Sequence, residues 1–348
     1  MANLGLQRAV VRTLLSLPGP VLRMMSGGGA VYKGGRTLDP RLQFLAAGAK
    51  KGPAMESLQP VEARASSAAG FAALSAPLEP GVRVGPEMIP GAEGERPARV
   101  YRPDNQDPQN ALLVFAHMGG GVIGDLDTCE SFCGILARAI QAPVISIDYR
   151  LAPEHRFPAG LDDVLAAYRW CRDHAERFGA PTGRAAIGGD SMGGHFASIV
   201  CQDLRRAGEA QPDLQLLIYP CVDVASETPS MTTYADAFPL GRATMEWFMG
   251  HYLNPTDDPA QLRLSPGRET DLTGLAPAVI ATAGFDPLID QGEAYARQLK
   301  AAGGHVEYRA YDSLCHGFTA FTGAVPPAAE ACREIAALAR DVLQGKQT

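Results

Sequence analysis

The sequence lacks any long apolar run. No stretch approaches the roughly 18 unbroken apolar residues that a membrane-spanning helix needs. The N-terminal segment is rich in leucine, but Arg8, Arg12 and Arg23 interrupt it, and no apolar region leads to a small-residue cleavage site. An excess of positive charge is missing too, because the formal net charge is −7. We therefore expect no membrane span, no nucleic-acid partner and a cytoplasmic location.

Cysteines are few and irregularly spaced. The seven stand at positions 129, 133, 171, 201, 221, 315 and 332. An odd number in a long chain argues against a disulfide framework. Cys129 and Cys133 would lie one helical turn apart, but no second pair has the spacing of zinc ligands. We interpret the cysteines as small buried side chains in a reducing compartment, and we expect no metal.

The 348 residues are 46% hydrophobic and 20% charged, enough for one large α/β domain with a smaller accessory part. From about residue 100, short apolar runs alternate with helical segments, which predicts a mainly parallel sheet flanked by helices. Strands are expected at Ala111–Ala116, Pro143–Asp148, Ala185–Gly188, Leu214–Tyr219, Ala278–Ala283 and Val306–Tyr311. Helices are expected at Thr128–Ile140, Asp162–Phe178, Gly194–Ala207, Gln291–Ala302 and Ala328–Leu343.

Two regions fall outside this alternation. Residues 1–75 have the pattern of loosely connected helices. Between about Ala225 and Leu275 one good helix, Arg242–Leu253, stands among turns rich in Pro, Asp and Thr. An irregular stretch of this length inside a compact domain is usually functional, for example as a lid.

The pentapeptide Gly189–Gly193 has the form Gly-x-Ser-x-Gly, with Ser191 at its centre. A serine hydroxyl becomes a nucleophile only when it is held in place and paired with a base. Ser191 falls between a predicted strand and a predicted helix, as a nucleophile elbow requires, and small flanking residues let the two segments approach closely.

A glycine run follows the first predicted strand: His117-Met118-Gly119-Gly120-Gly121. Backbone N–H groups in such a run can stabilise the oxyanion that forms during ester cleavage. An alternative exists, because Gly119, Gly121 and Gly124 also fit the dinucleotide-binding pattern G-x-G-x-x-G, and Asp148 ends the next strand. That oxidoreductase interpretation leaves Ser191 unexplained.

Candidate partners for Ser191 follow two later strands. His316 comes after Val306–Tyr311, and Asp286 comes after Ala278–Ala283, so both should emerge at the carboxyl edge of the sheet. The order Ser, Asp, His is the order that α/β hydrolases use. Asp290 and Asp312 compete for the role of the acid. The remaining histidines lie in predicted helices, in the glycine run or at the wrong edge of the sheet, except His155, which we interpret as a structural polar residue.

Four sequence blocks together resemble the hormone-sensitive-lipase-like esterases of the bacterial family IV type. They are His117–Gly121 with Gly124-Asp125, Asp148–His155 with Phe157–Ala159, Gly189–Gly194, and Asp286–Leu288 with His316–Phe318. The resemblance implies an α/β-hydrolase fold with catalytic Ser191, Asp286 and His316. It implies oxyanion donors at the N–H groups of Gly119, Gly120 and Met192. It also implies a helical cap made of residues 1–75 and 225–270 over a core of 76–224 and 271–348.

The chain departs from the family pattern at three positions. Met118 replaces a glycine, Gly121 stands where an aromatic residue is usual, and Met192 stands where alanine is common. We expect the chain to be a serine carboxylesterase that hydrolyses short- to medium-chain esters without a cofactor. The sheet edge at Val306–Tyr311 is the expected contact of a homodimer, although the sequence alone does not establish one. A non-catalytic small-molecule receptor on the same fold is the alternative from another class.

Overall fold

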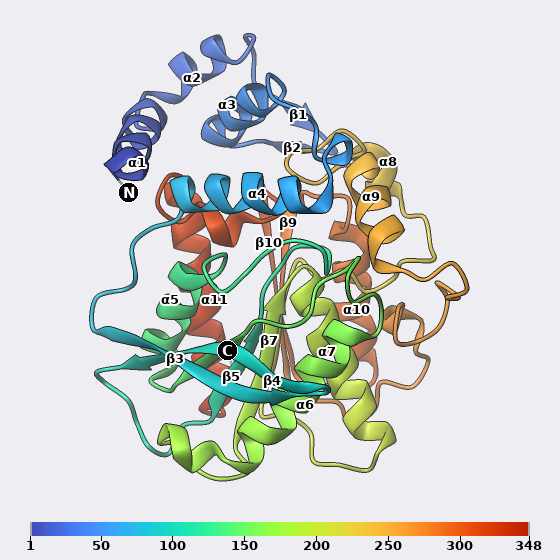
Figure 1. The fold of residues 1–348 in the computed structure, drawn as a ribbon. Helices are drawn as coiled ribbons and strands as arrows, with labels where there is room; N and C mark the ends of the chain where they lie inside the picture. Colours follow the sequence, from blue (N-terminus) through green and yellow to red (C-terminus); the bar gives the residue numbers. More distant parts are fainter. Residues whose placement is uncertain (1, 347–348) are drawn as a thin grey trace.

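The computed structural model describes residues 2–346, and within them one eight-stranded sheet forms the centre (Figure 1). Its strand order is β10-β9-β8-β7-β5-β6-β4-β3. The strands are β3 (Val82–Gly91), β4 (Gly94–Pro103), β5 (Leu112–Ala116), β6 (Val144–Ile147), β7 (Ala185–Asp190), β8 (Gln215–Ile218), β9 (Ala278–Phe285) and β10 (Val306–Cys315). Pairing is parallel from β10 to β6 and antiparallel for β4 and β3. The predicted mainly parallel sheet is confirmed.

Helices cover both faces of the sheet. One face carries α5 (Glu130–Ile140) and α11 (Pro326–Leu343), and the other carries α6 (Ala159–Asp173), α7 (Met192–Arg206) and α10 (Ile289–Ala301). Successive residues of β5 alternate between the two hydrophobic clusters, with Leu112 and Val114 in one and Leu113 and Phe115 in the other. Strands buried on both faces explain the continuous apolar runs in the sequence.

The hairpin of β3 and β4 was missed from the sequence. Proline and glycine interrupt the apolar pattern there, at Gly85, Pro86, Pro90 and Pro97. Proline is tolerated in β3 because that strand is the edge of the sheet. The alternation of apolar and polar residues that predicts a strand is therefore interrupted at the edge of the sheet, and it did not reveal this hairpin.

Several element boundaries differ from the prediction. Strand β7 continues to Asp190 and helix α7 begins at Met192, so a single residue, Ser191, separates them. Strand β10 runs to Cys315, with an irregularity after Tyr311 that leads the chain toward His316. The predicted helix Asp162–Phe178 is α6 followed by a separate 3₁₀ turn, Ala175–Phe178.

Further helices lie beyond the carboxyl edge of the parallel strands (Figure 1). They are α1 (Ala2–Leu15), α2 (Gly19–Met25), α3 (Pro40–Ala49) and α4 (Pro60–Leu74), together with α8 (Pro229–Thr233) and α9 (Arg242–Tyr252). The short ribbon β1 (Tyr32–Lys33) and β2 (Arg36–Thr37) lies between them. None of the helices in the described part of the chain is long and apolar enough to cross a membrane.

Arg64 of α4 joins these outer helices to the sheet. Its guanidinium donates to the carbonyl oxygens of Val122 and Ala152, each at 2.8 Å, and pairs with Glu154 at 2.6 Å. Elsewhere in the outer layer, Lys33 forms an ion pair with Asp236. Ionic contacts thus join residues that precede the sheet in sequence both to the loops at its carboxyl edge and to the segment between α8 and α9.

Candidate active site

Ser191 occupies the sharp turn between β7 and α7. Its backbone has φ 53° and ψ −114°, a conformation that residues with a side chain rarely adopt. A Cβ on Gly193 would lie 1.9 Å from the carbonyl oxygen of Ala116, and one on Gly189 would lie 2.3 Å from the carbonyl carbon of Gly193. Only glycine fits at either position, which is the close approach that the sequence motif predicted.

The three side chains predicted as nucleophile, base and acid meet at this turn. Nε2 of His316 is 2.8 Å from Oγ of Ser191, and Nδ1 of His316 is 2.7 Å from Oδ2 of Asp286. Asp286 is fully buried, and its Oδ1 accepts a hydrogen bond from the Leu288 N–H at 2.9 Å. Because the carboxylate takes the Nδ1 side of the ring, Nε2 faces the serine hydroxyl as an acceptor.

The competing acids have other partners. Asp290 accepts from the backbone N–H of Ser230 at 2.8 Å, and Asp312 pairs with Arg36 at the surface. His195 lies one turn beyond Ser191, but its Nδ1 contacts the Cys221 carbonyl oxygen at 2.7 Å. Burial lowers the pKa of His195 to about 4, so this ring stays neutral near neutral pH. Among the described residues, His316 is the imidazole hydrogen-bonded to Ser191.

A buried carboxylate beside the serine was missed from the sequence as a site group. Asp190 accepts hydrogen bonds from Thr319 at 2.7 Å, from the Tyr219 hydroxyl at 3.1 Å and from the Cys129 thiol at 3.4 Å. Burial raises the pKa of Asp190, and the three donors oppose that rise. The ring of Tyr219 lies 4.6 Å from the His316 ring, so this network links the serine turn to the histidine loop.

The glycine run bends back over the same site. Gly119, Gly120 and Gly121 have φ values of 130°, 61° and 71°, which favour glycine. Within residues 2–346, the N–H groups of Gly119, Gly120 and Met192 donate to no other group. All three residues line one cavity with Ser191 and His316. The arrangement leaves free donors beside the serine hydroxyl, as an oxyanion hole requires.

The dinucleotide-binding alternative is not favoured by this geometry. In that motif the glycines open a helix whose N-terminus binds the pyrophosphate. Here α5 begins only at Glu130, six residues beyond Gly124. A Cβ added to Gly124 would instead collide with the His117 ring, because it would lie 2.5 Å from Nδ1. This glycine makes room for a buried histidine.

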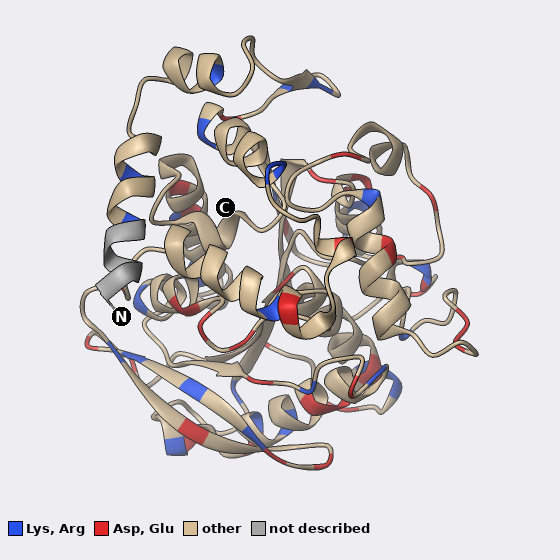
Figure 2. Ribbon diagram, turned by 45° about the horizontal axis from the view of Figure 1, so that its top comes forward, with Lys and Arg blue, Asp and Glu red and all other residues tan. Residues whose placement is uncertain are grey.

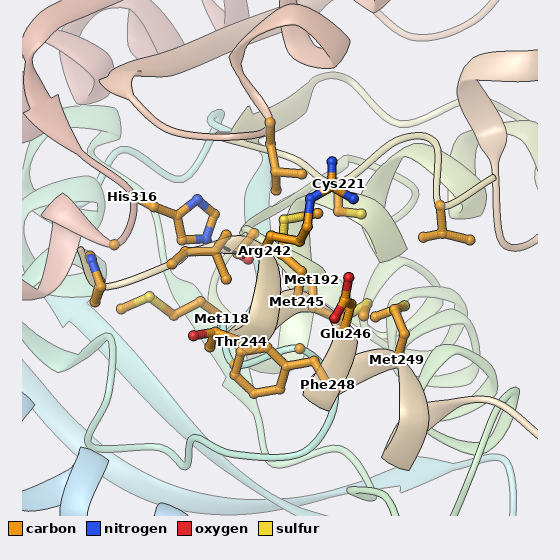
Figure 3. Close-up of a pocket in the computed structure, with 18 of the residues that line it drawn as sticks. Met118, Met192, Cys221, Arg242, Thr244, Met245, Glu246, Phe248, Met249 and His316 are labelled. Atoms are coloured by element: carbon orange, nitrogen blue, oxygen red, sulfur yellow. Dashed lines mark hydrogen bonds between the residues drawn. The ribbon is translucent and has the colours of Figure 1, made fainter. Parts of the chain in front are cut away.

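The cavity has a volume of about 300 Å³ and an apolar wall. Six of the ten methionines line it: Met55, Met118, Met192, Met231, Met245 and Met249. Figure 3 shows Met118 beside His316, with Met192, Met245 and Met249 on the opposite side. Methionine is flexible and polarisable, so such a wall adapts to differently shaped apolar groups.

Charged residues in the cavity lining are mostly acidic. Asp223, Glu227 and Glu246 line it with one cation, Arg242, which forms two hydrogen bonds with Glu227 at 2.8 and 2.6 Å. Figure 2 shows Lys and Arg scattered over the visible elements, interspersed with Asp and Glu. The thiol of Cys221 also lines the cavity. Burial raises the pKa of this thiol to about 12, which disfavours a thiolate nucleophile.

Sequence comparisons relate the chain to known hydrolases. A family described as having the α/β-hydrolase fold matches residues 113–320. The carboxylic ester hydrolase LipN of Mycobacterium tuberculosis is 44% identical over 318 residues, covering 88% of this chain and 84% of the relative. The carboxylesterase NlhH from the same species is 40% identical over 271 residues, covering 73% of this chain and 85% of the relative.

Solved structures agree with this relationship. LAE6, an α/β-hydrolase enzyme from the metagenome of Lake Arreo, superimposes with a TM-score of 0.83 at 40% identity, covering 87% of this chain and 96% of that one. A thermostable esterase from Pseudomonas putida gives a TM-score of 0.81 at 31% identity, with coverage of 86% and 96%.

Proposed function

Because the chain belongs to the hormone-sensitive-lipase-like family of α/β hydrolases and is a carboxylic ester hydrolase, we propose that Ser191, His316 and Asp286 carry out its reaction. The continuous hydrogen-bonded chain from Ser191 Oγ through both nitrogens of His316 to Asp286 is the observation that supports this proposal.

Acylation begins when His316 Nε2 takes the proton of the Ser191 hydroxyl and Oγ attacks the ester carbonyl carbon. The carbonyl oxygen becomes an oxyanion, which accepts hydrogen bonds from the N–H groups of Gly119, Gly120 and Met192. Collapse of this intermediate breaks the bond to the alcohol oxygen. That oxygen receives the proton from His316 and departs, which leaves an ester on Ser191.

Deacylation repeats these steps with water. His316 takes a proton from water, and the hydroxide oxygen attacks the acyl carbon. The bond to Ser191 Oγ breaks, Oγ recovers the proton from His316, and the carboxylic acid leaves. Asp286, hydrogen-bonded to His316 Nδ1, orients the ring and stabilises the imidazolium in both halves of the cycle.

Ser191→Ala tests the assignment on p-nitrophenyl esters. Removing Oγ should abolish nearly all turnover while the thermal melting temperature stays close to that of the wild type. Wild-type turnover by Ser191→Ala would contradict the mechanism. Turnover by the wild type would also exclude the alternative of a non-catalytic receptor.

For the substrate, we propose uncharged esters with short- to medium-chain acyl groups. An apolar cavity of about 300 Å³ that contains the serine supports this class. The acidic side chains among its charged residues disfavour acyl groups that carry a carboxylate. A series of p-nitrophenyl esters of increasing acyl length should give a maximum in kcat/KM followed by a decline. A continued rise to long chains would contradict the proposed size range.

We further propose that residues 1–75 and 225–270 form a cap over a core of 76–224 and 271–348. The position of α1–α4, α8 and α9 beyond the carboxyl edge of the sheet supports this division. We also propose a cytoplasmic location, supported by seven unpaired cysteines of which six are buried.

We propose a homodimer that forms through β10, because β10 is an edge strand of the sheet. Analytical ultracentrifugation tests it, and a monomer at micromolar concentration would contradict it.

A further inference from the structure

Helix α9 packs directly on the glycine run through two aromatic side chains. A Cβ on Gly120 would lie 2.4 Å from Cδ1 of Phe248, and a Cβ on Gly121 would lie 2.8 Å from Cδ2 of Tyr252. Phe248 and Tyr252 are four residues apart and therefore share one face of the helix. Figure 3 shows the Phe248 ring on the cavity wall near Met118.

This contact explains a departure from the family pattern. Gly121 stands where an aromatic residue is usual, and the space that a side chain would enter there is taken by the Tyr252 ring. The chain thus places beside the glycine run, from a distant helix, the kind of group that its own loop lacks.

Tyr252 is itself firmly held. Its side chain is 2% exposed, and its ring lies 5.9 Å from that of Phe157 and 6.4 Å from that of Phe196. The carbonyl oxygen of Tyr252 accepts from the Phe157 N–H at 2.9 Å. Arg156 donates to the Gly250 carbonyl oxygen at 3.0 Å, which anchors the last turn of α9. The ring that meets Gly121 is therefore fixed from the core side.

The two aromatic residues differ in their access to substrate. Phe248 lines the cavity, whereas Tyr252 is not among the residues that line it. Within the described part of the chain, the Tyr252 hydroxyl has no hydrogen-bond partner. Its contribution can therefore be separated from substrate contact and from hydrogen bonding.

We propose that Tyr252 and Phe248 are positioning residues for the oxyanion donors. Consecutive glycines with positive φ have little conformational preference of their own. Oxyanion stabilisation depends on donors that are already in place when charge develops. By occupying the space beside Gly120 and Gly121, the two rings restrict the loop to the conformation in which its N–H groups face the cavity. This inference rests on the proposed function.

A transition-state analogue separates positioning from simple stability. With an alkyl trifluoromethyl ketone, Ser191 Oγ adds to the carbonyl carbon, its proton passes to His316, and the carbonyl oxygen becomes the oxyanion. For Tyr252→Leu we expect kcat to fall by about tenfold or more and the Ki of the ketone to rise by a similar factor, while KM changes by less than about twofold. Tyr252→Phe should retain wild-type kinetics because the hydroxyl is unpartnered.

Phe178→Leu is the matched control. Phe178 is a buried aromatic residue of similar size that packs near Trp170, away from the glycine run. The Phe178→Leu variant should have a lower melting temperature than the wild type but the same kcat and the same Ki for the ketone. If Tyr252→Leu fails to fold, Tyr252→Met makes the same comparison.

Two outcomes would overturn the inference. One is a Tyr252→Leu enzyme with a lower melting temperature but unchanged kcat and Ki, which would show a structural role only. The other is a Tyr252→Phe enzyme that loses as much as Tyr252→Leu. Failure of the proposed function itself would appear differently, as turnover that survives Ser191→Ala.

Discussion

The phenol ring of Tyr219 lies against the imidazole of His316, with ring centroids 4.6 Å apart and an interplanar angle of 52°. The hydroxyl of Tyr219 is held at its far end by Asp190 and Thr319. His316 is therefore fixed by a hydrogen bond to Asp286 at one nitrogen and by an aromatic side chain at its ring.

Replacing the ring of Tyr219 should lower the rate of catalysis more than removing only its hydroxyl. For Tyr219→Leu we expect kcat/KM to fall by about tenfold, because the imidazole loses its lateral support. Tyr219→Phe should keep most activity but lower the free energy of unfolding by about 1.5–3 kcal/mol, since Asp190 loses a donor. Steady-state kinetics and urea unfolding measure the two effects. Unchanged kcat/KM in Tyr219→Leu would contradict the positioning role.

The serine turn should tolerate no side chain at Gly193. An added Cβ would lie 1.9 Å from the carbonyl oxygen of Ala116. The backbone at Ala116 or at Gly193 must therefore shift to accommodate the methyl group of Gly193→Ala. We expect the free energy of unfolding to fall by about 3 kcal/mol, the upper end of the usual cost of overpacking. Gly194→Ala is the neighbouring control, because its Cβ would meet its nearest atoms at 3.1 Å. Equal stabilities for the two variants, measured by chemical denaturation, would refute the close approach.

The Arg64–Glu154 ion pair should contribute stability only above acid pH. The Arg64 guanidinium lowers the pKa of Glu154 from 4.5 to about 2. A carboxyl with a lowered pKa stabilises the fold above its unfolded pKa and loses that contribution as pH falls toward its folded pKa. Because Glu154 is half exposed, the contribution should be under about 1 kcal/mol.

Glu154→Gln measures this contribution. At pH 7 the wild type should be slightly more stable than the variant, and the difference should shrink between pH 4.5 and about 2. Because extreme acid can unfold the whole chain, urea titrations from pH 7 down to about 3 cover the informative range. A difference that stays constant across this range would contradict an ionic origin.

Much of the site could be predicted because its residues follow strands of the parallel sheet. Ser191, Asp286 and His316 come directly after β7, β9 and β10, and parallel strands bring their carboxyl ends to one edge. The expected strand positions therefore indicated that the three side chains lie near one another. The departures at Met118 and Gly121 were also visible in the sequence.

Other features depend on packing between distant segments and leave no local pattern. Tyr219 directly follows β8, and only the fold brings its ring to His316. Tyr252 has ordinary helical spacing, and its contact with Gly121 is between residues 131 positions apart. The β3–β4 hairpin was missed because prolines obscure the alternation of an edge strand.

Labelling with an organophosphonate tests the central claim most directly. Ser191 should attack the phosphorus and displace its leaving group, which gives one stable adduct per chain. Mass spectrometry should find this adduct on the peptide that contains Ser191, more slowly formed in His316→Ala and absent from Ser191→Ala. Stoichiometric labelling of another residue, together with full esterase activity in Ser191→Ala, would contradict the account.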